Sequence, residues 1–102
     1  MAQFDVHKSP RGGVYPLVVD LQSDLHATLA TRVVVPLVMR RKYGGPQVTR
    51  LTPSVNVGDD EYVAVFPLMA AVPTSALGAA LTTIERQRAV LIAALDLLIT
   101  GS

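Results

Sequence analysis

The chain has 102 residues, a length that suits one domain spanning residues 1–102. Half of the residues are hydrophobic but few are aromatic, so Val, Leu, Ile and Ala must build the core. A net charge of +1 excludes a strong field that would steer the chain to nucleic acid or to an anionic membrane. The absence of cysteine excludes disulfides and thiolate metal sites, and with a start unlike a signal peptide it favours the cytoplasm.

Three segments in the first half predict strands. Residues 4–8 alternate apolar and polar side chains, and residues 14–23 and 32–38 are rich in β-branched residues. Pro16 and Pro36 cannot donate to a ladder, which predicts a bent and bulged sheet, as in a small barrel. The alternation places His7 on the polar side of its strand, where we expect a plain surface histidine.

Residues 39–53 interrupt this pattern and predict an excursion that faces solvent. A short basic run, Arg40, Arg41 and Lys42, precedes Gly44, Gly45 and Pro46, which force a turn. With Tyr43 as the nearby aromatic residue, a surface for single-stranded nucleic acid has weak support, and a solvated loop is an equal alternative.

Residues 54–69 predict a hairpin. Val55 and Val57 alternate with polar residues, and Gly58, Asp59 and Asp60 supply the turn. On the return strand the sequence places Tyr62, Ala64 and Phe66 on one face and Val63 and Val65 on the other. Both faces are apolar, so we expect cover on both sides, and Pro67 and Pro73 are expected to mark where pairing stops.

The last part predicts a helix that begins near a capping box formed by Thr82 and Glu85 and continues from Ala89 to Ile99. Its apolar residues surround most of the helix, and Asp96 is the only charge in that stretch. One thin sheet can cover only one side, so a second copy of the chain is expected to supply the remaining cover. Because Asp96 interrupts a stretch shorter than the ~18 residues of a membrane span, we expect no membrane contact.

The sequence offers no convincing catalytic set. His7 and His26 lack metal-ligand spacing, so neither a metal nor another cofactor is expected. The acidic residues 59–61 suit an exposed turn, while Asp20 and Asp24 suit the turn after a strand. No serine or threonine has a local nucleophile motif, which favours a protein that acts by binding rather than an enzyme.

Several stretches resemble the CcdB toxins in order and spacing: "QFDVHK", "YPLVVDLQSDL", "TRVVVPL", "PSVNVGDDEYV", "MAAVPTSALG" and "LDLLITGS". The resemblance implies a mainly β fold with one C-terminal α-helix, in which an SH3-like five-stranded barrel carries a small extra sheet and forms a homodimer. It further implies the toxin of a type II toxin–antitoxin module, which poisons DNA gyrase by binding its A subunit and trapping the cleaved DNA complex. A CcdA-type antitoxin neutralises such a toxin, and DNA is contacted only indirectly, through the autoregulatory complex of the two.

The resemblance also implies the gyrase-binding residues: Leu25, His26, Asp96, Ile99, Thr100, Gly101 and Ser102. A well-known plasmid member has a tryptophan in place of Thr100 and a terminal isoleucine in place of Ser102, so we expect a weakened or retuned affinity for gyrase. An acidic, disordered antitoxin suits the two basic segments, which gives as antitoxin-binding candidates Lys8, Arg11, Arg40, Arg41 and Lys42.

Two alternatives stay open at this point. The same barrel serves the MazF and Kid ribonucleases, and Asp20 with Arg32 is the pair that such an enzyme would use here. A non-toxic CcdB relative that only binds its antitoxin is the other alternative.

Overall fold

The computed structural model describes residues 2–26, 28–45 and 49–101, with His26 described by its backbone alone. The strands form a single, entirely antiparallel sheet, with β3 near its centre. The bounds are β1 Asp5–Lys8, β2 Leu17–Asp20, β3 Thr31–Met39, β4 Ser54–Val57, β5 Asp60–Ala64, β6 Ala70–Pro73 and β7 Thr82–Thr83. The order along the sheet is β4-β5-β3-β2-β1-β7, and β6 pairs with β3.

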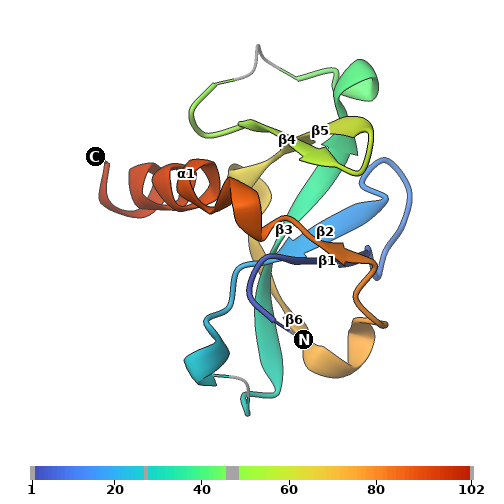
Figure 1. The fold of residues 1–102 in the computed structure, drawn as a ribbon, viewed down its shortest axis with the longest axis vertical. Helices are drawn as coiled ribbons and strands as arrows, with labels where there is room; N and C mark the ends of the chain where they lie inside the picture. Colours follow the sequence, from blue (N-terminus) through green and yellow to red (C-terminus); the bar gives the residue numbers. More distant parts are fainter. Residues whose placement is uncertain (1, 27, 46–48, 102) are drawn as a thin grey trace.

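Short 3-10 helices connect the strands, and one α-helix closes the described chain. Their bounds are η1 Asp24–His26, η2 Arg40–Lys42, η3 Phe66–Leu68, η4 Thr74–Ala76, η5 Glu85–Gln87 and α1 Arg88–Thr100. Figure 1 shows the sheet strongly curled and α1 projecting from it, with the C-terminus at its far end. The expected class, mainly β with a C-terminal helix, is confirmed, while the closed SH3-like barrel and the homodimer stay predictions.

The long strand β3 changes partner at Pro36. Its first residues pair with β6 and its last residues with β5, while β2 lies on the other edge. The Pro36 carbonyl accepts a hydrogen bond from the Val65 N–H (3.0 Å), but proline has no N–H to return. The Val65 carbonyl instead accepts from the Leu68 N–H (3.0 Å), which forms the turn η3. The sheet is therefore irregular at this internal proline, and the irregularity takes the form of a change of partner.

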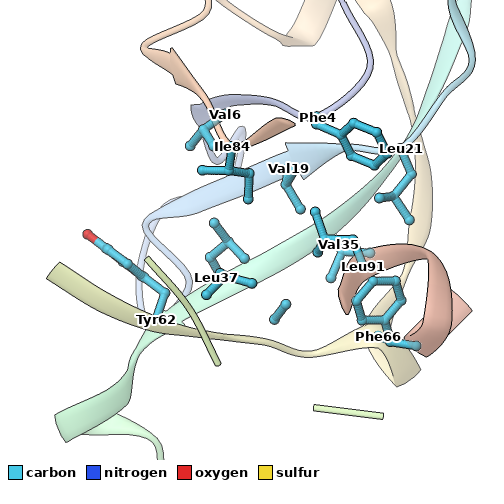
Figure 2. Close-up of a cluster of buried hydrophobic side chains, with 13 residues drawn as sticks. Phe4, Val6, Val19, Leu21, Val35, Leu37, Tyr62, Phe66, Ile84 and Leu91 are labelled. Carbon is cyan, nitrogen blue, oxygen red and sulfur yellow. The ribbon is translucent and has the colours of Figure 1, made fainter. Parts of the chain in front are cut away.

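Both faces of the sheet are covered, as the hairpin pattern predicts. Tyr62, Ala64 and Phe66 belong to the main core, which also buries Leu91 of α1. In Figure 2, Leu91 lies beside Phe66 and Val35, between the helix and the inner face of the sheet. On the outer face Val63 and Val65 pack with Val38, and a further small cluster contains Val18, Val34 and Leu77.

Three local predictions are wrong: the surface position of His7, the extent of the strand at 14–23, and the capping box. His7 is fully buried on the outer face rather than at the surface, and its Nδ1 donates to the Gly78 carbonyl (2.9 Å). Strand β2 covers only Leu17–Asp20 of the expected 14–23. The interruptions expected at Pro67 and Pro73 are confirmed: β5 ends before Pro67, which lies in η3, and β6 ends at Pro73.

The expected capping box does not form. Thr82 belongs to β7, which pairs with β1, and the Glu85 N–H donates to the Thr83 side chain (3.2 Å). The α-helix begins only at Arg88, although its course over Ala89–Ile99 is confirmed. Tertiary pairing with β1 overrides the local capping signal, because a sheet edge offers Thr82 a backbone partner.

Gln87 bridges the two ends of the curled sheet. Its Oε1 accepts from the Asn56 N–H of β4 (2.8 Å), and its Nε2 donates to the Asn56 carbonyl (2.7 Å). Gln87 follows shortly after β7, so its amide connects the opposite ends of the strand order. In the described part of the chain β4 and β7 do not pair, and the Gln87 amide makes the two hydrogen bonds to Asn56 that a neighbouring strand would otherwise make.

Replacing Gln87 by glutamate keeps the shape of this side chain and removes its donor. We expect Gln87→Glu to lower the free energy of unfolding by about 1 kcal/mol or more, because the Asn56 carbonyl then faces a carboxylate. Urea denaturation measures the change, with Arg86→Ala on the same turn as the control. A Gln87→Glu protein as stable as the unchanged chain would show that the bridge contributes nothing.

Candidate functional site

One side of α1 carries apolar residues that the described part of the chain covers only in part. Leu91 and Ala94 are buried against the core, and the partly buried Leu95 and Leu98 continue this side. A neighbouring side of the helix, which we call the outer stripe, consists of Val90, Ala93 and Leu97 at helical spacing. Val90 is 44% exposed and Ala93 is exposed, while Leu97 is half-buried. A shallow groove of about 440 Å³ runs beside the stripe and is lined by Val90, Ala93, Thr49, Arg50 and Pro53.

The end of α1 presents the residues assigned to gyrase binding. Asp96 and Thr100 are exposed, and Ile99 is 65% exposed although it is large and apolar. Gly101 ends the helix in the left-handed conformation (φ 78°), and its N–H donates to the Leu97 carbonyl (3.0 Å). The Thr100 hydroxyl donates to the Asp96 carbonyl (2.7 Å), so this side chain lies along the helix. Ser102 falls outside the described residues.

The turn η1 presents the other assigned residue, Leu25, which is 90% exposed. Its N–H donates to the Ser23 hydroxyl (3.2 Å), and the neighbouring Asp24 carboxylate accepts from the Gln3 N–H (2.8 Å). The backbone of His26 completes η1, while its side chain falls outside the described part. Figure 1 places η1 and the end of α1 apart, so one protomer does not join them into one patch.

Each of the two basic segments is followed by a tyrosine that packs on the outer face of the sheet. Lys8 and Arg11 are exposed in and after β1, and the basic run of η2 is fully exposed. Tyr15, which follows the first segment, and Tyr43, which follows the second, both pack against the outer cluster of Val38, Val63 and Val65. The shared cluster joins Tyr15 to Tyr43, and each tyrosine lies within seven residues of some of the antitoxin-binding candidates predicted from the sequence: Lys8, Arg11, Arg40, Arg41 and Lys42.

The remaining polar residues do not form a reactive centre in the described ranges. Asp20 and Arg32, the pair on which the ribonuclease alternative depends, are 0% and 1% exposed and bind each other, so RNA cannot reach them. Residues 59–61 lie exposed at the hairpin tip, as predicted for a turn. No group of three metal-ligating side chains is found among the described residues. In the same part of the chain, no helix combines the length and apolar character needed to cross a bilayer.

A comparison with protein families identifies the family of the chain. A family model described as CcdB protein matches residues 3–101 of the 102-residue chain. The chain belongs to the CcdB family. The match covers nearly the whole chain, which confirms the resemblance found in the sequence. Membership of the CcdB family implies a toxin of a toxin–antitoxin module.

The sequence analysis did not identify the residues that hold the loop before Leu25 in place. Gln3 reaches across to the loop before η1, where its Nε2 donates to the Leu21 carbonyl (3.1 Å). Ser23 fixes the Leu25 N–H, and the buried Asp20 and Arg32 reach the same loop from inside. Gln3 and Leu21 stand 18 residues apart, so no local pattern reveals their contact.

Proposed function

We propose that this CcdB-family chain poisons DNA gyrase by binding its A subunit and trapping the cleaved DNA complex. The observation that carries the proposal is an apolar side chain, Ile99, exposed at a fixed helix end in a chain that matches the CcdB family over residues 3–101. Leu25 is a similar exposed apolar side chain on an anchored turn. Apolar anchors of this kind commonly carry a large share of the binding energy at an interface. In this proposal the chain acts by binding and is not an enzyme, and neither a cofactor nor a metal takes part.

The gyrase-binding surface comprises the residues around these two anchors: Leu25, His26, Asp96, Ile99, Thr100, Gly101 and Ser102. The curled sheet, whose ends Gln87 bridges, supports the SH3-like barrel of this family. We place the protein in the cytoplasm, where gyrase acts.

A homodimer completes the proposed surface. The outer stripe of Val90, Ala93 and Leu97 is apolar and only partly covered by the described residues, which supports a second copy as its partner. A two-fold axis near the C-terminal helices places the two helix ends side by side. Gyrase then meets a paired platform rather than one isolated tip.

The antitoxin is a CcdA-type protein with an acidic, disordered segment. Its proposed contacts are the exposed basic residues of the two segments: Lys8, Arg11, Arg40, Arg41 and Lys42. The packing of Tyr15 and Tyr43 on one cluster supports a shared binding surface. A disordered segment can wrap such a broad surface because it folds as it binds. DNA is contacted through the complex of toxin and antitoxin.

The activity is tested with purified gyrase and supercoiled plasmid. We expect the chain to accumulate covalently trapped, cleaved DNA, and Ile99→Asp to raise the concentration needed by about tenfold or more, because the apolar anchor is lost. Leu81→Asp is the matched control, since Leu81 is 57% exposed against 65% for Ile99 and lies away from the helix. Folded protein that traps no cleaved DNA would refute gyrase poisoning.

Two further measurements distinguish this function from the two alternatives. Specific fragments from a long RNA would support a ribonuclease, and unhindered growth on induced expression would support a non-toxic relative.

The homodimer is tested by sedimentation at micromolar concentration. We expect twice the mass of one chain, and a monomer for Ala93→Glu, because a charge on the outer stripe would be buried without a partner. Ala79→Glu is the control, since Ala79 is exposed and lies outside α1. A monomeric unchanged chain would contradict the dimer.

The antitoxin face is tested with a peptide from the acidic half of the protein encoded immediately upstream. We expect Arg41→Glu to slow association about threefold or more at low salt, with a smaller effect at high salt, because exposed charges act mainly on encounter. Arg86→Glu is the matched control, since both arginines are exposed on 3-10 helices. Equal effects of the two substitutions would place the contact elsewhere.

A further inference from the structure

We propose that the buried ion pair of Asp20 and Arg32, together with Gln3, positions residues 21–25 so that Leu25 is presented to gyrase. This inference rests on the proposed function and assigns positioning residues to its surface. Neither member of the ion pair is accessible enough to touch a macromolecular partner, since their exposed fractions are 0% and 1%.

The ion pair holds both backbone polar groups of one residue, Gln22. Arg32 Nε donates to Asp20 Oδ2 (2.8 Å), and Arg32 Nη2 forms an ion pair with the same oxygen (2.7 Å). The free oxygen of the carboxylate, Oδ1, accepts from the Gln22 N–H (2.8 Å), and Arg32 Nη2 also donates to the Gln22 carbonyl (3.0 Å). Gln22 lies where the chain leaves β2 for η1, so the ion pair fixes the direction in which the loop departs.

Gln3 holds the same loop from the other side. Its Nε2 donates to the Leu21 carbonyl (3.1 Å), and its N–H donates to Asp24 Oδ1 (2.8 Å). Gln3 is itself held because the neighbouring Phe4 is 2% exposed and lies under the Arg88 guanidinium, 5.5 Å from the ring centre. Together these contacts fix the loop immediately before Leu25.

Stability alone gives a weak reason for burying these charges. Replacing a buried ion pair by apolar side chains of similar volume is often neutral or stabilising. Strands β2 and β3 are already joined by backbone pairing over Leu17–Asp20, and the Leu21 N–H extends it by donating to the Val33 carbonyl (2.8 Å). The distinctive contribution of the ion pair is therefore its hold on Gln22.

A fixed loop matters because Leu25 has almost no packing of its own. With 90% of its surface exposed, its position depends on the backbone that carries it. A loop that is already in its binding conformation avoids the loss of affinity that ordering on contact would bring.

The test replaces the ion pair by apolar residues in the full chain, as Asp20→Leu with Arg32→Met. We expect the thermal midpoint to stay within about 5 °C while amide exchange at Gln22 and Leu25 accelerates. Affinity for the gyrase A subunit should fall about tenfold, as it would if only a tenth of the molecules held the binding-competent loop. Gln3→Ala removes the outer contact without exposing a buried charge and should weaken binding in the same direction, which keeps the test decisive if the double variant does not fold.

Two further variants separate the possible failures. His7→Leu removes a different buried polar group of the outer face, and its binding to gyrase should equal that of the unchanged chain. Leu25→Ala should weaken binding directly. If Leu25→Ala weakens binding while the ion-pair and Gln3 variants bind normally, the positioning role is overturned and the proposed surface stands. If Leu25→Ala binds normally, both the contact between the loop and gyrase and the positioning role are refuted. If the unchanged chain traps no cleaved DNA, the proposed function itself is refuted.

Discussion

The missing N–H of Pro36 is the constraint on which much of the architecture depends. Because Pro36 cannot return a hydrogen bond to Val65, the Val65 carbonyl bonds to Leu68, and the chain leaves β3 as η3. This turn buries Phe66 in the main core, and α1 packs against it. After η3 the chain pairs with β3 again as β6. Pro36 therefore marks the place where β3 changes partner and where the turn that contacts α1 begins. The position of the helix end therefore follows from a break in the middle of a strand.

The small core explains why the outer surfaces are built as they are. A 102-residue chain whose sheet is covered on both faces has little apolar material left to surround a helix. Leu91 and Ala94 pack one side of α1 against the core, whereas Val90 and Ala93 of the outer stripe are exposed among the described residues. Exposed apolar residues grouped on one rigid element are typical of interaction surfaces rather than of a finished monomer.

Local patterns predicted much of the fold, and tertiary contacts explain the failures. The alternation around Val63 predicted a strand covered on both faces, and the apolar run after Ala89 predicted the helix, because both signals lie within one element. His7 was misplaced because its cover comes from Gly78, 71 residues away. The Thr82 signal failed because a sheet edge competed with the helix cap. For the candidate site, sequence could suggest Leu25 and the helix end, but the contacts that hold them cross the chain and leave no periodic trace.

The chemistry of the helix end gives Ile99 a larger role than its neighbours. The Thr100 hydroxyl is engaged by the Asp96 carbonyl, and Gly101 turns the chain away from the helix axis. Neither residue offers an apolar side chain of any size, and Asp96 offers a charge. Ile99 is thus the large apolar group exposed on the last turn, just as Leu25 is on η1. In a dimer with its helices near the two-fold axis, two such side chains would lie close together, and a small apolar contact would be doubled by symmetry. Such doubling would give a chain with Thr100 in place of a tryptophan an apolar platform for the proposed contact with gyrase.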